Sequence, residues 1–127
     1  MFTGSSYSTT DIKREMASVL FNIGGLHMNL GASNDRQTAD GMKMSCSHFQ
    51  QAAWAFQKLS EKPQQRDTDL SSEILTFLST VSLAQAQECI LEKSILDGHK
   101  PETVAKVICV MLEHILIFFN TLLLNSL

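Results

Sequence analysis

The sequence predicts an all-α protein built from antiparallel helical hairpins. Apolar residues recur at intervals of three and four along four segments, and no segment shows sustained alternation of apolar and polar residues. The 127 residues are 44% hydrophobic with only 6 Gly and 2 Pro, so the chain can bury a core and is not intrinsically disordered. Long helices with two apolar faces favour a solenoid-like stack, of the tetratricopeptide (TPR) kind, over a closed four-helix bundle.

The first helix is expected over about residues 12–30, after a Ser/Thr-rich lead-in at residues 1–10 that is expected to be disordered. Its apolar residues fall on two faces, Ile12, Met16, Val19, Leu20, Ile23, Leu26 and Leu30 on one, and Ala17, Phe21, Gly24 and Met28 on the other. We therefore expect neighbours on two sides of this helix. Gly24 and Gly25 each cost about 1 kcal/mol relative to Ala within a helix, and the close approach of a neighbouring helix is the simplest compensation.

The second and third helices are separated by turn-forming residues and a proline. A break at 31–37 precedes a second helix over about 38–60, and Pro63 cannot continue that helix. The third helix is expected over about 70–97, with Asp69 or Ser71 as its N-cap. The second helix carries one apolar stripe, formed by Met42, Cys46, Phe49, Ala53 and Phe56.

The fourth helix is expected from residue 101 onward and leads into an apolar tail at 104–127. Gly98 suits the left-handed position after a helix, and Pro101 suits a first helical turn. In the tail 17 of 24 residues are apolar, and Lys106 and Glu113 are its only charges. We favour an alternative C-terminal end over a membrane-spanning helix, because a carboxylate in mid-membrane costs about 3 kcal/mol. Either form exposes apolar surface, which favours oligomerisation or aggregation.

Composition excludes several classes of function. The net charge of −3 gives no basic footprint for nucleic acid. Cys46, Cys89 and Cys109 form no CxxC pair, so we expect buried free thiols rather than disulfides or a zinc site. The N-terminus has no basic segment followed by an apolar core, so it is not a signal peptide, and we expect a cytoplasmic protein.

No motif predicts catalysis, a metal or a cofactor. The four histidines, His27, His48, His99 and His114, form no His-x3-His or Glu-x-x-His pair on one helical face. The chain has no His-Cys-x5-Arg loop, no GxSxG elbow and no glycine-rich phosphate loop. We therefore expect a chain that is not an enzyme.

The polar run LAQAQEC in the third helix contains Gln85, Gln87 and Glu88. Gln85 shares an apolar stripe with Leu78 and Cys89, and a buried amide without hydrogen bonds costs about 1–3 kcal/mol. We expect its amide to bond the backbone of a neighbouring helix and so to determine the register of the two helices. A direct contact with a ligand is the alternative.

Three ordered blocks resemble the central helices of the Bro-one domain, a boomerang-shaped domain of helical repeats. They are residues 14–31 (REMASVLFNIGGLHMNLG), 40–59 (DGMKMSCSHFQQAAWAFQKL) and 83–98 (LAQAQECILEKSILDG). The resemblance covers about residues 11–107 and is closest to the family's His-domain protein tyrosine phosphatase branch. It implies a partial domain, which ends where the apolar tail diverges. Trp54 stands where relatives carry Gly, so it must either repack that helix contact or point outward.

The resemblance implies a non-catalytic adaptor of endosomal sorting that is recruited from the cytoplasm to endosomes. Such domains bind the C-terminal amphipathic helix of an ESCRT-III subunit, charged multivesicular body protein four, in an apolar groove. Carried over by position, the contacts fall on Ile90, Thr103 and Val107, and Lys43 would meet an acidic group of the partner. Relatives carry a larger aliphatic residue at Thr103, which weakens the groove here.

Other interpretations stay open. Ile90 and Val107 fit ordinary core packing, and Lys43 fits a solvated surface. At the level of the whole protein, the alternatives are a fragment of a non-receptor tyrosine phosphatase that lacks its catalytic domain, or a rhophilin-like module in small-GTPase signalling.

Overall fold

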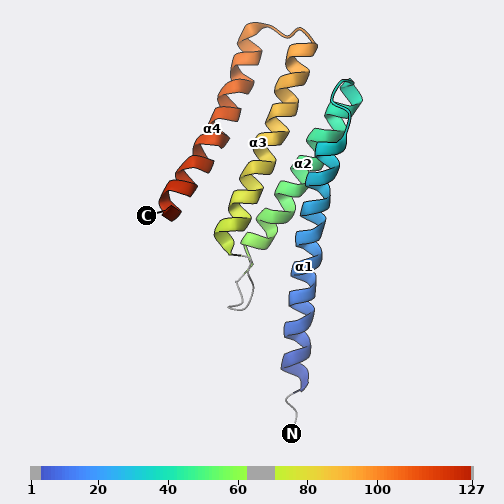
Figure 1. The fold of residues 1–127 in the computed structure, drawn as a ribbon, viewed down its shortest axis with the longest axis vertical. Coiled ribbons are helices and arrows are strands. Elements are labelled where there is room, and N and C mark those ends of the chain that lie inside the picture. Colours follow the sequence, from blue (N-terminus) through green and yellow to red (C-terminus); the bar gives the residue numbers. More distant parts are fainter. Residues whose placement is uncertain (1–3, 63–70, 127) are drawn as a thin grey trace.

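The computed structural model describes residues 4–62 and 71–126, and these form four α-helices: α1 (Gly4–Ser33), α2 (Ala39–Ser60), α3 (Ser72–Leu96) and α4 (Pro101–Ser126). The helices lie in a row in chain order and alternate in direction (Figure 1). Each packs mainly on its neighbours in the chain, α1 on α2, α2 on α3 and α3 on α4. The predicted all-α stack of antiparallel helices is therefore confirmed.

Local sequence signals account for most of the helix ends. The Thr38 Oγ1 accepts a hydrogen bond from the Gly41 N–H at 3.0 Å, and the Ser71 Oγ accepts one from Ile74 at 3.2 Å. Gly98 takes a φ of 65°, and its N–H bonds the carbonyl of Ile95 at 3.1 Å. The N–H of the next residue bonds the Ser94 carbonyl, which completes a Schellman motif at the end of α3.

The start of α1 differs from the prediction. The helix begins at Gly4 rather than Ile12, so residues 4–10 of the expected disordered lead-in are helical, while 1–3 lie outside the described residues. Extending an existing helix adds one hydrogen bond per residue, which outweighs the modest helix propensity of Ser and Thr. Asp69, the alternative N-cap for α3, also lies outside the described residues.

The core lies where α1 and α3 meet α2. Phe49 and Phe56 of α2 are 1% exposed, and the Phe56 ring contacts Phe21 of α1 edge-on at 5.7 Å between centroids. A Cβ atom on Gly24 would lie 2.8 Å from the Phe56 ring, and one on Gly31 would lie 2.9 Å from the Phe49 ring. The predicted close approach is thus present at Gly24, whereas nothing lies within 4 Å of a Cβ on Gly25.

Buried hydroxyl groups also connect the helices. The Ser45 Oγ of α2 donates to the Gly31 carbonyl of α1, and the Ser79 Oγ of α3 donates to the Ala53 carbonyl at 3.0 Å. The Nδ1 atoms of His27 and His48 lie 2.9 Å apart between α1 and α2. These contacts determine how the helices are aligned along their lengths.

The expectation that α1 is covered on two sides is wrong. Its second predicted face packs on α2, but the first face, apart from Leu20, is 40–61% exposed: Ile12, Met16, Val19, Ile23, Leu26 and Leu30. Helical periodicity identifies an apolar face and does not say which partner covers it. Within the described residues, α1 packs mainly on α2.

Candidate functional site

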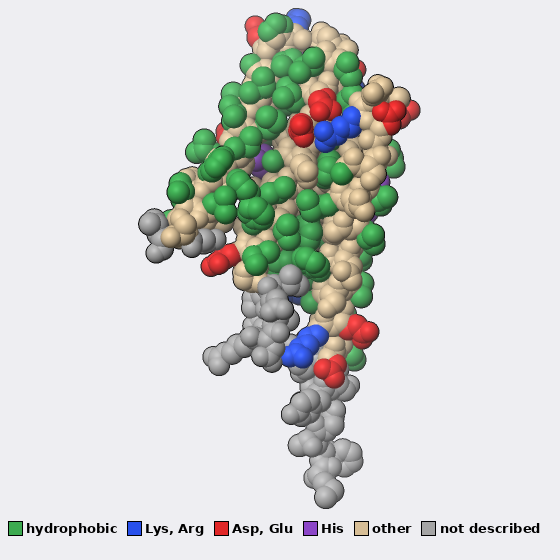
Figure 2. Space-filling model, viewed as in Figure 1, with side chains coloured by type: hydrophobic (Ala, Val, Ile, Leu, Met, Phe, Trp, Pro, Cys, Tyr) green, Lys and Arg blue, Asp and Glu red, His purple; other side chains and the backbone are tan. Residues whose placement is uncertain are grey.

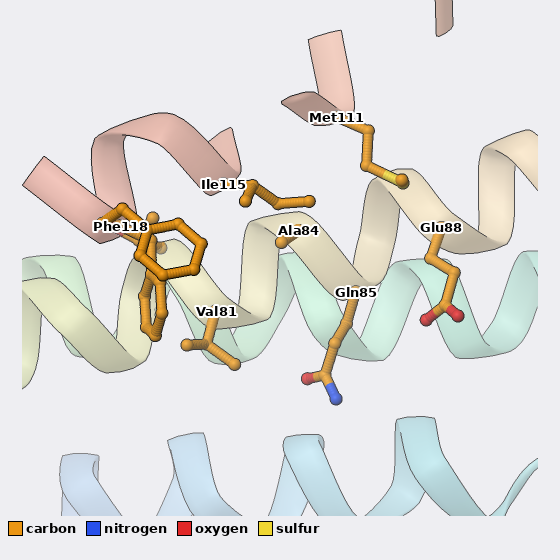
Figure 3. A pocket seen from close by; sticks show the side chains of 9 residues that line it. Val81, Ala84, Gln85, Glu88, Met111, Ile115 and Phe118 are labelled. Carbon is orange, nitrogen blue, oxygen red and sulfur yellow. The ribbon is translucent and has the colours of Figure 1, made fainter. Parts of the chain in front are cut away.

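An apolar groove of about 350 Å³ lies between α3 and α4 (Figure 3). It is lined by Thr80, Val81, Ala84, Gln85, Glu88, Met111, Ile115, Phe118 and Phe119. In Figure 3, Ile115 of α4 lies over Ala84 of α3, with Met111 and Phe118 on either side of it, while Val81 projects from α3 on the side away from α4. We call this feature the α3/α4 groove; a volume of this size suits a few large side chains from a partner.

Two members of the predicted polar motif lie at the edge of the α3/α4 groove. The Gln85 and Glu88 side chains project from α3 on the side away from α4 (Figure 3). Among the described residues, the Gln85 Oε1 is the buried side-chain polar atom that has no hydrogen-bond partner. The expected bond from a neighbouring backbone is therefore absent at this oxygen. Gln87, the third member of the motif, is half-buried and does not line the groove.

Arg36, in the loop between α1 and α2, makes a polar contact across to α3. Its guanidinium lies 3.5 Å from Glu88 and 3.3 Å from Glu92, donates to the Cys89 Sγ at 3.3 Å, and lies 5.8 Å from the centroid of the Phe49 ring. Partial burial alone would lower the pKa of Arg36, but Cys89 and the two carboxylates outweigh it, so the pKa is raised. Arg36 therefore neutralises the acidic edge of the groove.

The four residues expected to bind a partner helix do not line this groove. Ile90 on α3 and Val107 on α4 are half-buried, while Thr103 and Lys43 are exposed. Ile90 follows Glu88 by two residues, which is about 200° around a helix, so the two side chains lie on nearly opposite sides of α3. The α3–α4 layer therefore has two separate surfaces.

We call the four residues that the resemblance predicts to bind a partner helix, Ile90, Thr103, Val107 and Lys43, the Ile90 face. Helices α3 and α4 are antiparallel; Ile90 lies seven residues before the C-cap Asp97, and Val107 seven after Lys100. Both residues therefore lie at a similar distance from the connecting loop. Lys43 approaches the same end of α3. A hydrogen bond from Lys93 lowers the pKa of Asp97, and its electrostatic interactions with His99 and Lys43 act in the same direction.

The thiols and histidines show no constellation for catalysis or metal binding within residues 4–62 and 71–126. No group of three His, Cys, Asp or Glu side chains there could hold a metal ion. Cys89 is buried and Cys46 half-buried, and burial raises the pKa of the Cys46 thiol. Cys109 is exposed, so the expectation of buried thiols is wrong at this position.

Exposed apolar side chains are concentrated on α4. Helix α4 is long and apolar enough, over Pro101–Leu124, to span a membrane; its most apolar 18-residue stretch has a mean hydropathy of 2.2, and none of that stretch is buried. Helix α3 also meets that criterion, but a third of its most apolar stretch is buried in the fold. Figure 2 shows hydrophobic side chains gathered over α3 and α4. Trp54, on α2, also points outward and is 56% exposed.

A row of antiparallel helices with apolar surfaces has the features of a helical protein-binding module. The family model for the BRO1-like domain matches residues 1–115. The chain therefore belongs to the BRO1-like domain family, and the predicted resemblance is confirmed. The match includes the first half of α4 and extends eight residues beyond Val107.

Relatives with known names cover most of the chain. It is 50% identical over 108 residues to tyrosine-protein phosphatase non-receptor type 23 of Mus musculus, and 40% identical over 118 residues to ALG-2 interacting protein X of Dictyostelium discoideum. It is 36% identical over 104 residues to vacuolar-sorting protein BRO1 of Arabidopsis thaliana. The matches cover 84%, 89% and 76% of this chain but only 6%, 15% and 12% of the relatives.

Reading the sequence did not predict the α3/α4 groove. Its α4 side comes from Met111, Ile115, Phe118 and Phe119, which lie in the tail whose packing was left open. Their spacing of three and four residues is the signal that would have placed them on one helical face. What they pack against depends on the direction in which α4 returns along α3.

Proposed function

We propose that this chain is a non-catalytic adaptor module of endosomal sorting. It takes the C-terminal amphipathic helix of an ESCRT-III subunit, of the charged multivesicular body protein four type, on the Ile90 face. The observation that carries the proposal is membership of the BRO1-like domain family, to which the Arabidopsis vacuolar-sorting protein is similar through this same region. The chain would act in the cytoplasm and reach endosomes through its partner.

The physical basis is the docking of an apolar helix face between two antiparallel helices. Half-buried Ile90 and Val107 leave part of each side chain accessible at a similar level of α3 and α4. Exposed Lys43 supplies a positive charge near the loop end of α3, where it would meet an acidic residue of the partner. Thr103 supplies less apolar area than an aliphatic side chain, which points to a weak interaction.

Phosphatase activity belongs, on this proposal, to other parts of a longer protein. The match to the mouse phosphatase covers only 6% of that relative, and this sequence contains no His-Cys-x5-Arg loop. The chain would therefore contribute binding and localisation rather than chemistry.

The test replaces Ile90 by Asp, since a carboxylate on this face opposes insertion of an apolar partner side chain. We expect I90D to weaken binding of a fluorescent peptide of the ESCRT-III C-terminal helix by about 30-fold or more, measured by fluorescence polarisation. The matched control is I74D, the same substitution on an Ile of α3 that is 47% exposed and lies 16 residues away.

We expect I74D to bind the peptide like the parent chain. Circular dichroism on both variants verifies that the helices remain folded. If I90D and the parent chain are both folded and bind the peptide with equal affinity, the proposal is contradicted. Equal loss in I90D and I74D would instead indicate a general effect of added charge and would also contradict it.

A further inference from the structure

A continuous apolar stripe runs along α4 beside the α3/α4 groove. It consists of Ile108, Leu112, Leu116, Phe119 and Leu123, which are 37–62% exposed. Their spacing of three and four residues places them on one side of the helix. Phe119 belongs to both the stripe and the groove, so the two form one surface.

A polar line on α4 argues against a lipid partner for this surface. Lys106, Glu113 and Asn120 lie seven residues apart and are exposed. Each follows a half-buried residue of α4 by two positions, or about 200°, so the line points away from α3. A bilayer around α4 would bury Glu113 at about 3 kcal/mol, whereas a helix laid along the stripe leaves the polar line in water.

The stripe can pair with the same stripe of a second copy when the two α4 helices run in opposite directions. About a two-fold axis between Ile115 and Leu116, Ile108 lies opposite Leu123 of a second copy, and Leu112 lies opposite Phe119. No charged residue belongs to the stripe, so antiparallel pairing places no like charges directly opposite each other. Isologous pairing of this kind closes a dimer rather than propagating a filament.

We propose that a second copy of this chain occupies the surface, through antiparallel pairing of α4 with α4. The stripe and the rim of the groove offer roughly 500 Å² per copy, so the pair buries about 1,000 Å², at the lower end for a specific interface. Buried area by itself does not determine a dissociation constant, so the affinity of the pair has to be measured. Ile90 points to the opposite side of α3 from Glu88, so the dimer leaves the proposed partner face free.

The first experiment measures the mass of the whole chain by sedimentation equilibrium between about 1 and about 100 µM. We expect a monomer–dimer equilibrium in the parent chain. L116D places a charge beside the two-fold axis and should weaken the dimer by at least about 30-fold. The control is I117D, which alters the next residue, 53% exposed and about 100° away from the stripe; its dimer should be unchanged.

The orientation is tested with one added cysteine at a time, in a C46S/C109S background that keeps only the buried Cys89, and a short bismaleimide cross-linker. L116C should cross-link to its own copy, because the axis passes beside it. I108C should not, because the two copies of residue 108 lie about 22 Å apart along the antiparallel pair. Cross-linking of I108C would instead indicate parallel pairing and overturn the proposal.

Other outcomes are equally decisive. A monomer at all concentrations contradicts the proposal, as does equal loss of the dimer in L116D and I117D. Co-sedimentation with phosphatidylcholine–phosphatidylserine vesicles, abolished by L116D and seen without a dimer in solution, would identify lipid as the occupant and would contradict the proposal.

If L116D loses helical circular dichroism, the variants L112A and F119A take its place, and both must weaken the dimer. A failed dimer leaves the binding of the ESCRT-III peptide, measured with I90D, unaffected.

Discussion

Thr103 on the first turns of α4 is exposed and belongs to the Ile90 face, where the Bro-one resemblance leads us to expect a larger aliphatic side chain. The hydroxyl offers a partner helix less apolar contact than Leu would. Each additional buried methylene contributes about 0.8 kcal/mol, so this single position can limit affinity.

T103L should therefore bind the ESCRT-III peptide about 3- to 10-fold more tightly than the parent chain. Titration by fluorescence polarisation measures the change. The matched control is T76L, the same substitution at an exposed Thr on the first turns of α3, far from the Ile90 face. Unchanged or weaker binding of T103L would show that residue 103 does not contact the peptide.

The burial of the Gln85 side chain could be predicted from the sequence, but its hydrogen bonding could not. Its place on an apolar stripe correctly predicted a partly buried amide, but its Oε1 has no protein partner. The distance from this oxygen to a neighbouring backbone depends on how α3 sits against the other helices. No periodicity along one helix contains that information.

At the scale of elements, the contact of α1 with α2 depends on residues without side chains. Gly24 and Gly25 are adjacent and equally unfavourable in a helix, yet only Gly24 lies against the Phe56 ring. Phe56 is 1% exposed and cannot move aside easily. Substitutions at Gly24 and Gly25 therefore differ in the contact with Phe56 and share the same helix propensity.

We expect opposite effects of alanine at these two positions. G25A should raise the free energy of unfolding by about 0.5–1 kcal/mol, because Ala is the better helix former and meets no neighbour. G24A should lower it by up to about 2 kcal/mol, because overpacking against Phe56 outweighs the gain in helix propensity. Urea unfolding followed by circular dichroism measures both; the same sign for both would contradict the contact of α1 with α2 described above.

Helix ends were predicted well because their signals are local. Thr38, Ser71 and Gly98 act through hydrogen bonds or backbone angles within a few residues of themselves. The start of α1 was missed because residues 4–10 carry no cap and no apolar pattern. Their helix is a continuation of the turns that follow.

At the scale of the whole molecule, both core clusters lie in α1, α2 and α3, and neither contains a residue of α4. In the described residues α4 packs mainly on α3, so it contributes to the stability of this chain mainly through that interface. Helix α4 is therefore expected to be dispensable for the core.

A chain that ends at Gly98 should keep a cooperative unfolding transition in urea, with helical circular dichroism reduced in proportion to the lost residues. It should also be monomeric, because the stripe is absent. Non-cooperative unfolding would show that α3 needs α4 to stay folded. A dimer of the shortened chain would place the self-association elsewhere, for example on the exposed stripe of α1.

The sequence by itself determined the all-α class, the caps, the buried stripe of α2 and the family, because each depends on residues close together in the chain or on ordered blocks of identity. Only the tertiary structure decided which face of α1 is covered, which glycine is packed, and that Ile90 and the α3/α4 groove lie on different sides of α3. Those outcomes depend on distances between helices, and an amphipathic pattern identifies an apolar face without naming its neighbour.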